Sequence, residues 1–342
     1  MYESAEANPH LTWETVLKAN IGFDLSMWNG LLGVEMDVYR DLRRDKIIVP
    51  TDDFPTEYGI KPSQYNAGKE ERYGVDLTVT NHTEINRNFS IDNSLVFGFS
   101  RDKQVDIAES MGTYSIPRFR RTGKSASQLR GYIAEGLFSS QEEIDNSPTQ
   151  NLGSTVKPGD IKYRDVNGDG KIDGSDQVMI SPYGTTPRIQ YGLGMNVTYK
   201  KFDFGVFFNG SAKRTIMISG ISPFGQSDYN VMQFIADDYW SESNPNPNAK
   251  YPRLTSEGSA NNYTTNSLWV ADASYMKLRT LELYYNFSQE MMKKSKFIKG
   301  AKVFARGHDL FCVDKIKVLD PENIGTNHPT MTQYTFGVNL SF

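Results

Sequence analysis

The chain has almost no cysteine and no long apolar run. Cys312 is the one cysteine among 342 residues, which excludes an internal disulfide framework and a cysteine metal cluster. No stretch approaches the roughly 20 consecutive apolar residues that a membrane-spanning helix needs, and the mean hydropathy is −0.53. Residues 1–9 have neither a basic segment nor an apolar core, so they do not form a signal peptide. Because other features below indicate a surface protein, we interpret the chain as a carboxy-terminal piece of something longer.

An excess of positive charge and a catalytic constellation are also missing. Lys and Arg number 37 against 41 Asp and Glu, without a basic stripe, so we expect no nucleic-acid partner. The four histidines have no ligand or triad spacing. Glu142 and Glu143 could form a carboxylate pair for sugar hydrolysis, but adjacent loop charges are far more often solvated. We therefore expect no catalytic residues and no enzyme.

What the chain does contain is a repeated alternation of apolar and polar residues, which is the period of a β-strand with two different faces. Residues 19–38 predict the first hairpin, with Asn29-Gly30 as a two-residue turn. The predicted strands that follow are 73–79 paired with 89–99 across an Asn81–Asn88 turn, 190–209 turning at Lys200-Lys201, 275–287 paired with 301–309, and a last strand ending on Phe342. This gives about nine strands.

The last strand and the lengths of the connections both favour a barrel in a membrane. A soluble protein seldom leaves an apolar strand unpaired at an edge, whereas a barrel pairs its last strand with its first. The strand also resembles the signal by which the outer-membrane insertion machinery recognises its clients. Short connections alternate with long ones, as periplasmic turns alternate with extracellular loops. The long connections are 44–68, 101–188, 211–274 and 310–333.

These observations predict an all-β fold, an antiparallel transmembrane β-barrel with long extracellular loops. Nine strands would become eleven if the loop 101–188 contributed one hairpin, for which Arg130–Phe138 is the candidate strand. A soluble sandwich gives the same alternation with its faces exchanged. The alternative is therefore a secreted, calcium-stabilised β-sandwich adhesin or carbohydrate-binding module, in which Ile21 and Phe23 would lie in a core between two sheets.

Four segments, in order, resemble the SusC/RagA family of TonB-linked outer-membrane transporters. They are Asn8–Glu14 with Asn20–Asp24, then Gly159–Gly170, then Ala273–Arg279, and finally Asp320–Glu322 with the terminal Phe-Gly-Val-Asn-Leu-Ser-Phe. The likeness covers residues 1–342 as the carboxy-terminal barrel half. The family's signal peptide, TonB-contacting segment, plug and first barrel strands have no counterpart in this chain.

The resemblance implies a location in the cell outer membrane, with lipid around the barrel. It also implies import of glycans or peptides, energised by the TonB complex through the missing amino-terminal part, together with a SusD-like lipoprotein. Transporters of this kind have about 22 strands around a plugged lumen, which nine strands cannot enclose. We expect the fragment alone not to transport. The sequence does not identify substrate-binding residues.

The loop 165–176 has the oxygen-ligand spacing of an EF-hand-type calcium loop. The predicted ligands are the side chains of Asp165, Asn167, Asp169, Asp173 and Asp176 and the backbone carbonyl of Lys171. Position twelve departs from the pattern, because it holds Asp rather than a bidentate Glu. The prediction is a structural calcium ion as cofactor. The alternative is an Asp/Asn/Gly-rich turn held by its own side-chain hydrogen bonds.

Aromatic residues in the loops and strands allow two interpretations each. Trp240, Tyr239 and Trp269 could stack on sugars or pack the loops together, and we favour packing for Trp269. Phe207 and Phe208 are predicted to belong to the outer aromatic girdle of the barrel, with core packing as the alternative.

Overall fold

One curved antiparallel sheet of nine strands dominates the computed structural model, which describes residues 7–49, 62–218, 231–255, 259–292, 297–323 and 328–342. The strands of this sheet, in their spatial order, are β1 (Thr15–Met27), β2 (Leu32–Ile48), β3 (Tyr65–Asn86), β4 (Phe89–Asp106), β11 (Ile189–Tyr199), β12 (Phe202–Ala212), β15 (Tyr275–Asn286), β16 (Gly300–Asp314) and β17 (Gln333–Ser341). Strands that follow one another in this sheet also follow one another along the chain, with the long loops inserted between some of them. The predicted count of nine strands is confirmed.

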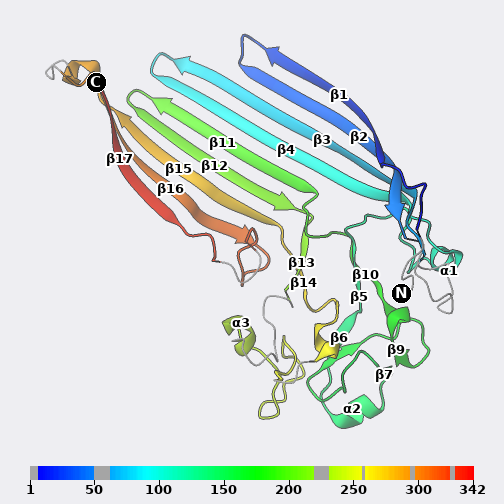
Figure 1. The fold of residues 1–342 in the computed structure, drawn as a ribbon. Coiled ribbons are helices and arrows are strands. Elements are labelled where there is room, and N and C mark those ends of the chain that lie inside the picture. The colour runs from blue at the N-terminus through cyan, green and yellow to red at the C-terminus, as the bar shows by residue number, and fades with distance from the viewer. Residues whose placement is uncertain (1–6, 50–61, 219–230, 256–258, 293–296, 324–327) are drawn as a thin grey trace.

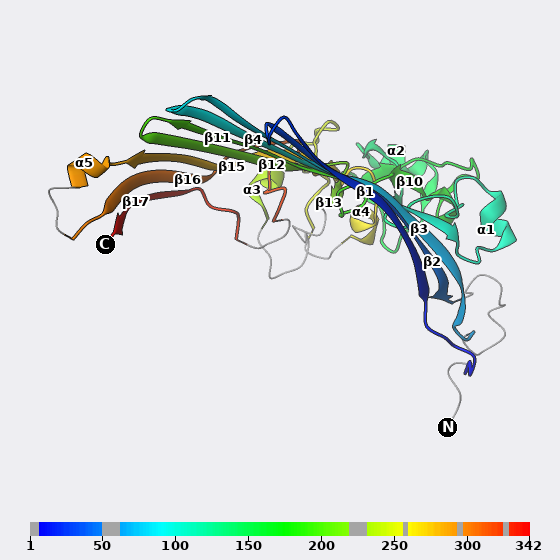
Figure 2. The same cartoon turned by 90° about the horizontal axis from the view of Figure 1, so that it is seen from above.

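The sheet is bent into a trough with different structures at its two ends. Seen from above, the sheet forms an arc, with β17 and β1 at its two rims (Figure 2). The turns between paired strands lie at one end, and the long loops gather at the other (Figure 1). Within the part of the chain that the structure describes, β1 and β17 each have a partner strand on one side only. The arrangement is a segment of an antiparallel barrel wall, as the alternation predicted.

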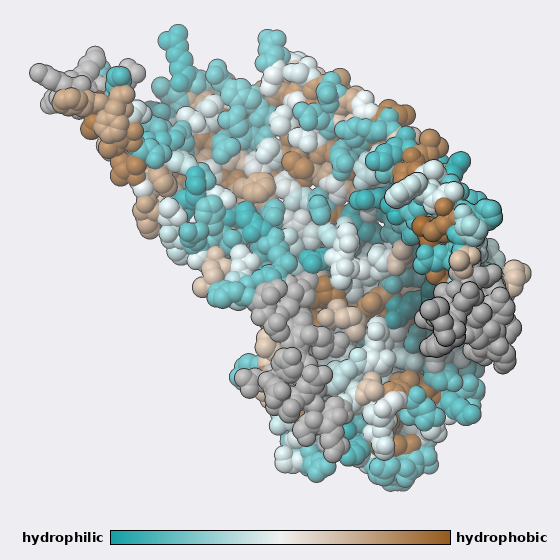
Figure 3. All heavy atoms as spheres, viewed as in Figure 1, coloured by the Kyte–Doolittle hydropathy of each residue, from teal (hydrophilic) through white to brown (hydrophobic). Residues whose placement is uncertain are grey.

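Register gives the sheet one apolar and one polar face. Directly opposed residues share a face, and one row across the first four strands reads Ile21, Val38, Val75, Phe99. The adjacent row on the other face reads Gly22, Asp37, Asp76, Gly98. Figure 3, which looks onto the concave side, shows a mainly hydrophilic surface over the sheet. The convex side therefore carries the apolar rows.

The apolar rows are exposed. The exposed fraction of Ile21 is 80% and that of Phe336 is 78%. No second sheet packs on the convex face among the described residues. The β-sandwich alternative, which needed Ile21 and Phe23 in a common core, is wrong.

Turn geometry explains two hairpins and corrects a third. Asn29 and Gly30 have φ values of 57° and 89°, and the Leu31 amide donates to the Trp28 carbonyl at 3.2 Å. This is the predicted two-residue turn of type I′. The Lys200-Lys201 turn also forms as predicted.

The predicted Asn81–Asn88 turn is wrong. β3 runs on to Asn86, and the strands reverse at Arg87 and Asn88. Asn81 lies opposite Asn93, and the Asn93 side-chain amide donates to the Asn81 side-chain oxygen at 3.2 Å. The ladder therefore continues past Asn81 to the pair of Asn86 with Phe89.

The described parts of the long loops form a region of short elements, here called the loop region (the described residues of 107–188 and 213–274). It contains α1 (Met111–Ser115), β5 (Leu129–Gly131), β6 (Ala134–Leu137), α2 (Gln141–Asp145), β7 (Thr149–Gln150), β8 (Ile161–Tyr163), β9 (Lys171–Ile172), η2 (Gly174–Asp176), β10 (Val178–Ser181), β13 (Thr215–Met217), α3 (Gln233–Ala236), α4 (Ala260–Tyr263) and β14 (Val270–Asp272). A further short helix, α5 (Gln289–Met292), lies in the turn between β15 and β16. Among the described helices, none has the length and apolar character to cross a membrane.

The candidate extra barrel strand, Arg130–Phe138, is instead part of the loop region. β5 pairs with β10 and β6 pairs with β8, each in a two-stranded sheet of its own. These strands have three and four residues, too few to cross a bilayer, which takes about 9–11. The loop therefore adds no strand to the nine.

The aromatic girdle lies elsewhere than predicted. Phe207 is opposite Gly194 on the concave face, and only Phe208 is on the convex face. Consecutive residues of a strand point to opposite sides, so the girdle prediction is wrong for Phe207. A convex row at the short-turn end is aromatic across β4, β11, β12 and β15, where it contains Phe89, Tyr199, Phe202 and Tyr285. Neighbouring rings in it lie 5.8 and 5.0 Å apart.

Candidate functional site

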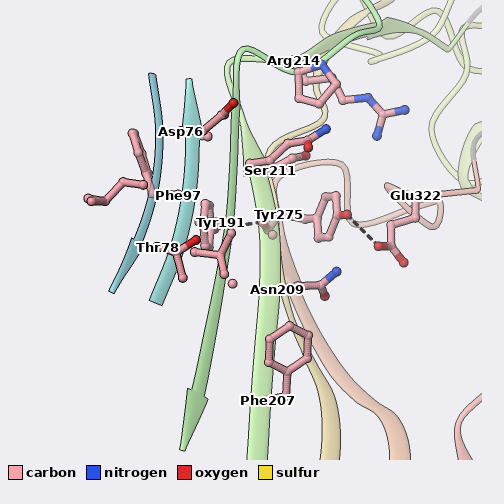
Figure 4. Close-up of a pocket in the computed structure, with 17 residues that line it drawn as sticks. Asp76, Thr78, Phe97, Tyr191, Phe207, Asn209, Ser211, Arg214, Tyr275 and Glu322 are labelled. Atoms are coloured by element: carbon pink, nitrogen blue, oxygen red, sulfur yellow. Dashed lines mark hydrogen bonds between the residues drawn. The ribbon is translucent and has the colours of Figure 1, made fainter. Parts of the chain in front are cut away.

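A hollow of about 770 Å³ opens on the concave face beside the loop region. Polar residues of the concave face line it, including Asp76, Thr78, Asn209 and Ser211 (Figure 4) together with Gln190. Apolar side chains, among them Leu77, Val96 and Phe97, line it as well. Carboxamides, hydroxyls and a carboxylate therefore face the same space. Such a wall can donate and accept hydrogen bonds to a polar solute.

Phe207 is an aromatic side chain on this wall. A Cβ built on Gly192 would lie 3.2 Å from the Phe207 ring, and one built on Gly194 would lie 3.6 Å from it. The ring therefore lies over two glycines of β11, and its exposed fraction is 38%. It adds an aromatic surface to the hollow beside the hydrogen-bonding groups.

Arg214, Tyr275 and Glu322 close the loop end of the hollow (Figure 4). The Tyr275 hydroxyl donates to Glu322 at 2.6 Å. Arg214 donates through Nη1 to the Pro321 carbonyl and through Nε to the Thr185 carbonyl, each at 2.7 Å. The segment Asp320–Glu322 is thus tied to the wall from two sides.

Beside the hollow, two segments of the sequence motif set converge in an ion-pair cluster. Lys277 Nζ lies 2.8 Å from Asp320 and 2.9 Å from Glu322. Arg279 pairs with Asp309 at 2.5 Å and also with Glu322. Only 5% of the Lys277 side chain is exposed. The cluster fastens the loop after β16 to the concave side of β15.

A bulge in β15 makes the cluster possible. Leu278 faces Phe208 and Leu281 faces Val206, so two convex residues stand three apart, which a regular strand does not allow. The register shift falls at Arg279. On β16, Asp309 lies in the matching irregularity with φ of 50°. Both irregular positions supply a charge to the same cluster.

Electrostatics keep the two loop carboxylates of this cluster ionised. Burial alone would raise the pKa of Asp320 and of Glu322. Hydrogen bonds outweigh burial and hold both pKa values below their usual range. The donors to Asp320 are Lys277, Thr330 and the Glu322 amide; those to Glu322 are Tyr275, Lys277 and Arg279. The cluster is therefore fully charged at neutral pH.

The Gly159–Gly170 motif has its first half in the core of the loop region. Asp160 is fully buried and pairs with Arg253 at 2.7 Å, and it accepts from the side-chain amide of Asn262 at 2.8 Å. Gly159 has a φ of 86°, and a Cβ there would lie 2.2 Å from the Trp240 ring. The motif thus joins two loops about 100 residues apart.

Trp269 and Trp240 belong to the same core, with exposed fractions of 0% and 4%. The Trp269 ring stacks on Tyr251 and Tyr263, with centroids 5.8 and 6.1 Å apart. Tyr239 packs against this core while remaining partly exposed. The packing interpretation holds for both tryptophans, which have no surface left for a sugar.

In the calcium-type loop, the predicted ligands mostly accept hydrogen bonds from the loop's own backbone. Asp165 accepts from the Gly168 and Gly170 amides at 2.6 and 2.8 Å, and Asp169 accepts from Lys171 at 2.9 Å.

The second half of the loop is a capped 3₁₀ turn. Asp173 accepts from the Ser175 amide at 2.8 Å. The fully buried Asp176 accepts from Val166 and Asp173. Among the described residues, no group of three Asp, Glu, His or Cys side chains is arranged around a common metal position. The geometry is that of a self-bonded turn, and calcium binding stays a prediction.

Glu142 and Glu143 do not form a catalytic pair. The Ser139 amide and hydroxyl donate to Glu143, and Lys162 lies 2.9 Å from it. The Ser139 amide and Lys162 together lower the pKa of Glu143 to about 2. Glu143 therefore anchors the first turn of α2 and stays ionised.

Comparison with known proteins found relatives that are TonB-dependent receptors. No protein-family model matches the chain. A TonB-dependent receptor of Formosa agariphila is 26% identical over 363 residues, which cover 98% of this chain and 35% of the relative. The TonB-dependent receptor SusC of Bacteroides thetaiotaomicron is 23% identical over 354 residues, covering 98% and 32%. The chain spans about a third of the length of these curated relatives.

Two solved structures have the same fold. The RagAB peptide importer in its open-open state superposes with a TM-score of 0.71 at 20% identity, covering 99% of this chain and 36% of that one. Its closed-closed state gives 0.69 at 21% identity, with the same coverage.

Proposed function

We propose that the protein of which this chain is part takes up a glycan or a peptide through the outer membrane. The comparisons confirm the SusC/RagA resemblance, the antiparallel barrel fold and the outer-membrane location. The relatives are receptors and importers, so the expectation of no enzymatic function is also confirmed. The observation that carries the proposal is the hollow on the concave wall, which both hydrogen-bonding and apolar side chains line.

The two faces of the sheet support this function together. The convex face offers apolar side chains to lipid, while the concave face offers hydrogen-bonding groups to a solute. The hollow lies where the concave wall meets the loop region, on the side from which an extracellular solute would arrive. Gln190 and Asn209 suit either substrate, because hydroxyl groups and peptide groups both use carboxamide partners.

We infer the energy source and the partner protein from the relatives. TonB would act on the part of the longer protein that corresponds to the uncovered part of these relatives. A SusD-like lipoprotein would cover the loop region from outside. The ion-pair cluster at Lys277 fits a mechanical role, because it holds the loop after β16 against the wall while solute passes.

Growth experiments on the intact gene test the proposal. We expect its disruption to abolish growth on one class of glycan or on peptides, with restoration by the full-length protein. The double variant Gln190→Ala, Asn209→Ala should restore uptake several-fold less well. Gln333→Ala, at the exposed start of β17, is the matched control and should restore it fully.

The two levels of the proposal fail separately. Unchanged growth of the disrupted strain on every glycan and peptide source would refute the import function. Full restoration by the double variant would leave import standing and exclude the hollow as the solute contact.

We also propose that the loop 165–176 binds a structural calcium ion in the folded protein. The support is its ligand spacing, and binding would replace backbone hydrogen bonds to Asp165 and Asp169. Calorimetric titration of the full-length protein with calcium should show binding that the Asp165→Ala, Asp169→Ala variant lacks. Equal heats from both proteins would mean that the loop is only a turn.

A further inference from the structure

At the loop end of the convex face, the apolar rows give way to a patch of cations. The row Ile21, Val38, Val75, Phe99 is entirely apolar. The next convex row toward the loops reads Ala19, Arg40, Tyr73, Arg101, and the one after it reads Leu17, Leu42, Glu71, Lys103. Arg44, opposite Thr15, and Lys213, directly after β12, extend the patch. The basic rim is this set of five: Arg40, Arg44, Arg101, Lys103 and Lys213.

The height of the apolar band places the basic rim at the level of the lipid headgroups. β11 has 11 residues, which span about 33 Å along the strand. At a tilt of about 40° this corresponds to about 25 Å of membrane, the usual height of the apolar band. On β11 the band thus runs from Tyr199 to Ile189, and Ile189 lies opposite Phe99. Arg101 lies one convex row beyond.

Among the residues that the structure describes, most of the rim has no counter-ion. Arg40 pairs with Glu71 at 2.5 Å, and Glu71 is the one carboxylate in the two convex rows. Arg44, Arg101, Lys103 and Lys213 form no ion pair within the residues that the structure describes, and all four are exposed. The Lys213 ammonium lies 6.0 Å from the centroid of the Phe99 ring. A cation is thus held directly against the last apolar row.

We infer that the basic rim binds the phosphate groups of an anionic lipid in the outer leaflet. A guanidinium matches two phosphate oxygens at once, and an ammonium adds a compact charge. The acyl chains of the same lipid would lie on the apolar rows below, so one molecule would satisfy both surfaces. A soluble anion would gain only the charge contacts. The rim therefore fits lipid better than a free phosphate.

The test compares lipids retained by the full-length protein. Native mass spectrometry of the purified protein, offered equal amounts of phosphatidylglycerol and phosphatidylcholine, measures its preference for the anionic lipid. The variant Arg44→Gln, Arg101→Gln, Lys213→Gln should lose this preference, by about five-fold for each cation removed. Raised salt should weaken the preference of the unchanged protein. An excess of inorganic phosphate should not displace the lipid.

Two controls make the outcome decisive. Arg72→Gln changes an arginine of β3 that bonds Ser100 on the other face, and it should keep the preference. Arg44→Lys, Arg101→Lys, Lys213→Arg keeps the charges and should also keep it, whether or not the neutral variant folds. Loss of preference in either control, retention in the neutral variant, or displacement by inorganic phosphate would each overturn the inference.

Discussion

The sheet and the loop region place the same residue types in opposite positions. In the sheet, Ile21 and Phe336 are among the most exposed side chains, whereas Ile161 and Trp269 in the loop region are fully buried. Among the described residues with buried apolar side chains, only Leu278 belongs to the nine-stranded sheet. Apolar groups leave water in both regions. The loop region provides its own core, while the sheet relies on lipid.

Polar groups show the converse difference. On the concave face they stay accessible around the hollow, as Asn209 and Ser211 do. In the loop region Asp160, Asn261 and Asn262 are fully buried, and each has hydrogen-bond partners. A buried polar group without a partner would be costly. Polar groups of the sheet are thus accessible to a solute, whereas those of the loop region form hydrogen bonds between its segments.

The largest expected effect separates the two regions. Trp269→Ala should destabilise the loop region by about 3–5 kcal/mol, because it empties the centre of its core. The sheet should stay intact, since Trp269 lies outside it. Limited proteolysis of the full-length protein in its membrane measures the loop region, and heat-modifiable mobility on gels measures the barrel. Loss of the barrel as well would show that the two regions do not fold separately.

A charge on the convex face should have the next largest effect, and it acts on the sheet alone. Leu193→Arg places a cation in the middle of the apolar band and should cost about 2–4 kcal/mol of barrel stability. Asn196→Arg is the matched control, because Asn196 faces Asp92 on the concave side. Denaturant unfolding of both variants in lipid measures the difference. Equal stability would contradict the assignment of the two faces.

Two glycines with nearly equal φ sharpen the comparison further. Gly159 (86°) lies against Trp240, whereas nothing lies within 4 Å of a Cβ at Gly30 (89°). Ala at either position costs about 1–2 kcal/mol of backbone strain. Gly159→Ala adds about 1–3 kcal/mol of overpacking. Unfolding free energies of the two variants should therefore differ by the packing contribution, and similar values would mean that the loop core relaxes freely.

The smallest expected effect concerns the ion-pair cluster that holds the loop after β16 against the sheet. The pKa values of Asp320 and Glu322 are lowered by their partners, although burial opposes the shift. Their contribution is complete above the ordinary values of 3.8 and 4.5, and it is lost as pH falls below them. Asp320→Asn should remove about 1.5 kcal/mol at neutral pH.

Hydrogen exchange of the segment 315–323 at pH 7 and pH 3 measures this effect. Asp272→Asn is the control, because its pair with Lys315 is exposed and contributes little. If the protection of these amides from exchange is the same at both pH values and in the Asp320→Asn variant, the ion pairs do not hold the segment.

The alternation of apolar and polar residues was enough to predict the strands, because a sheet between lipid and water needs one apolar and one polar face. It placed the hairpins around Asn29-Gly30 and Lys200-Lys201 correctly, since turn chemistry there is local. It failed at Asn81–Asn88 and at Arg130–Phe138, where pairing partners rather than local residue type decide whether a strand continues. It also assigned Phe207 and Phe208 to one face, although adjacent residues of a strand cannot share one.

The sequence by itself determined the nine strands, the two faces and the family resemblance, because each depends on residues close together in the chain. Only the tertiary structure brought Lys277 and Arg279 to Asp320 and Glu322, and only it set Phe207 over Gly192 and Gly194 in the hollow. Those contacts depend on register, on the bulge at Arg279 and on the path of a loop. Register and loop path are set by pairings between distant segments, which no local pattern specifies.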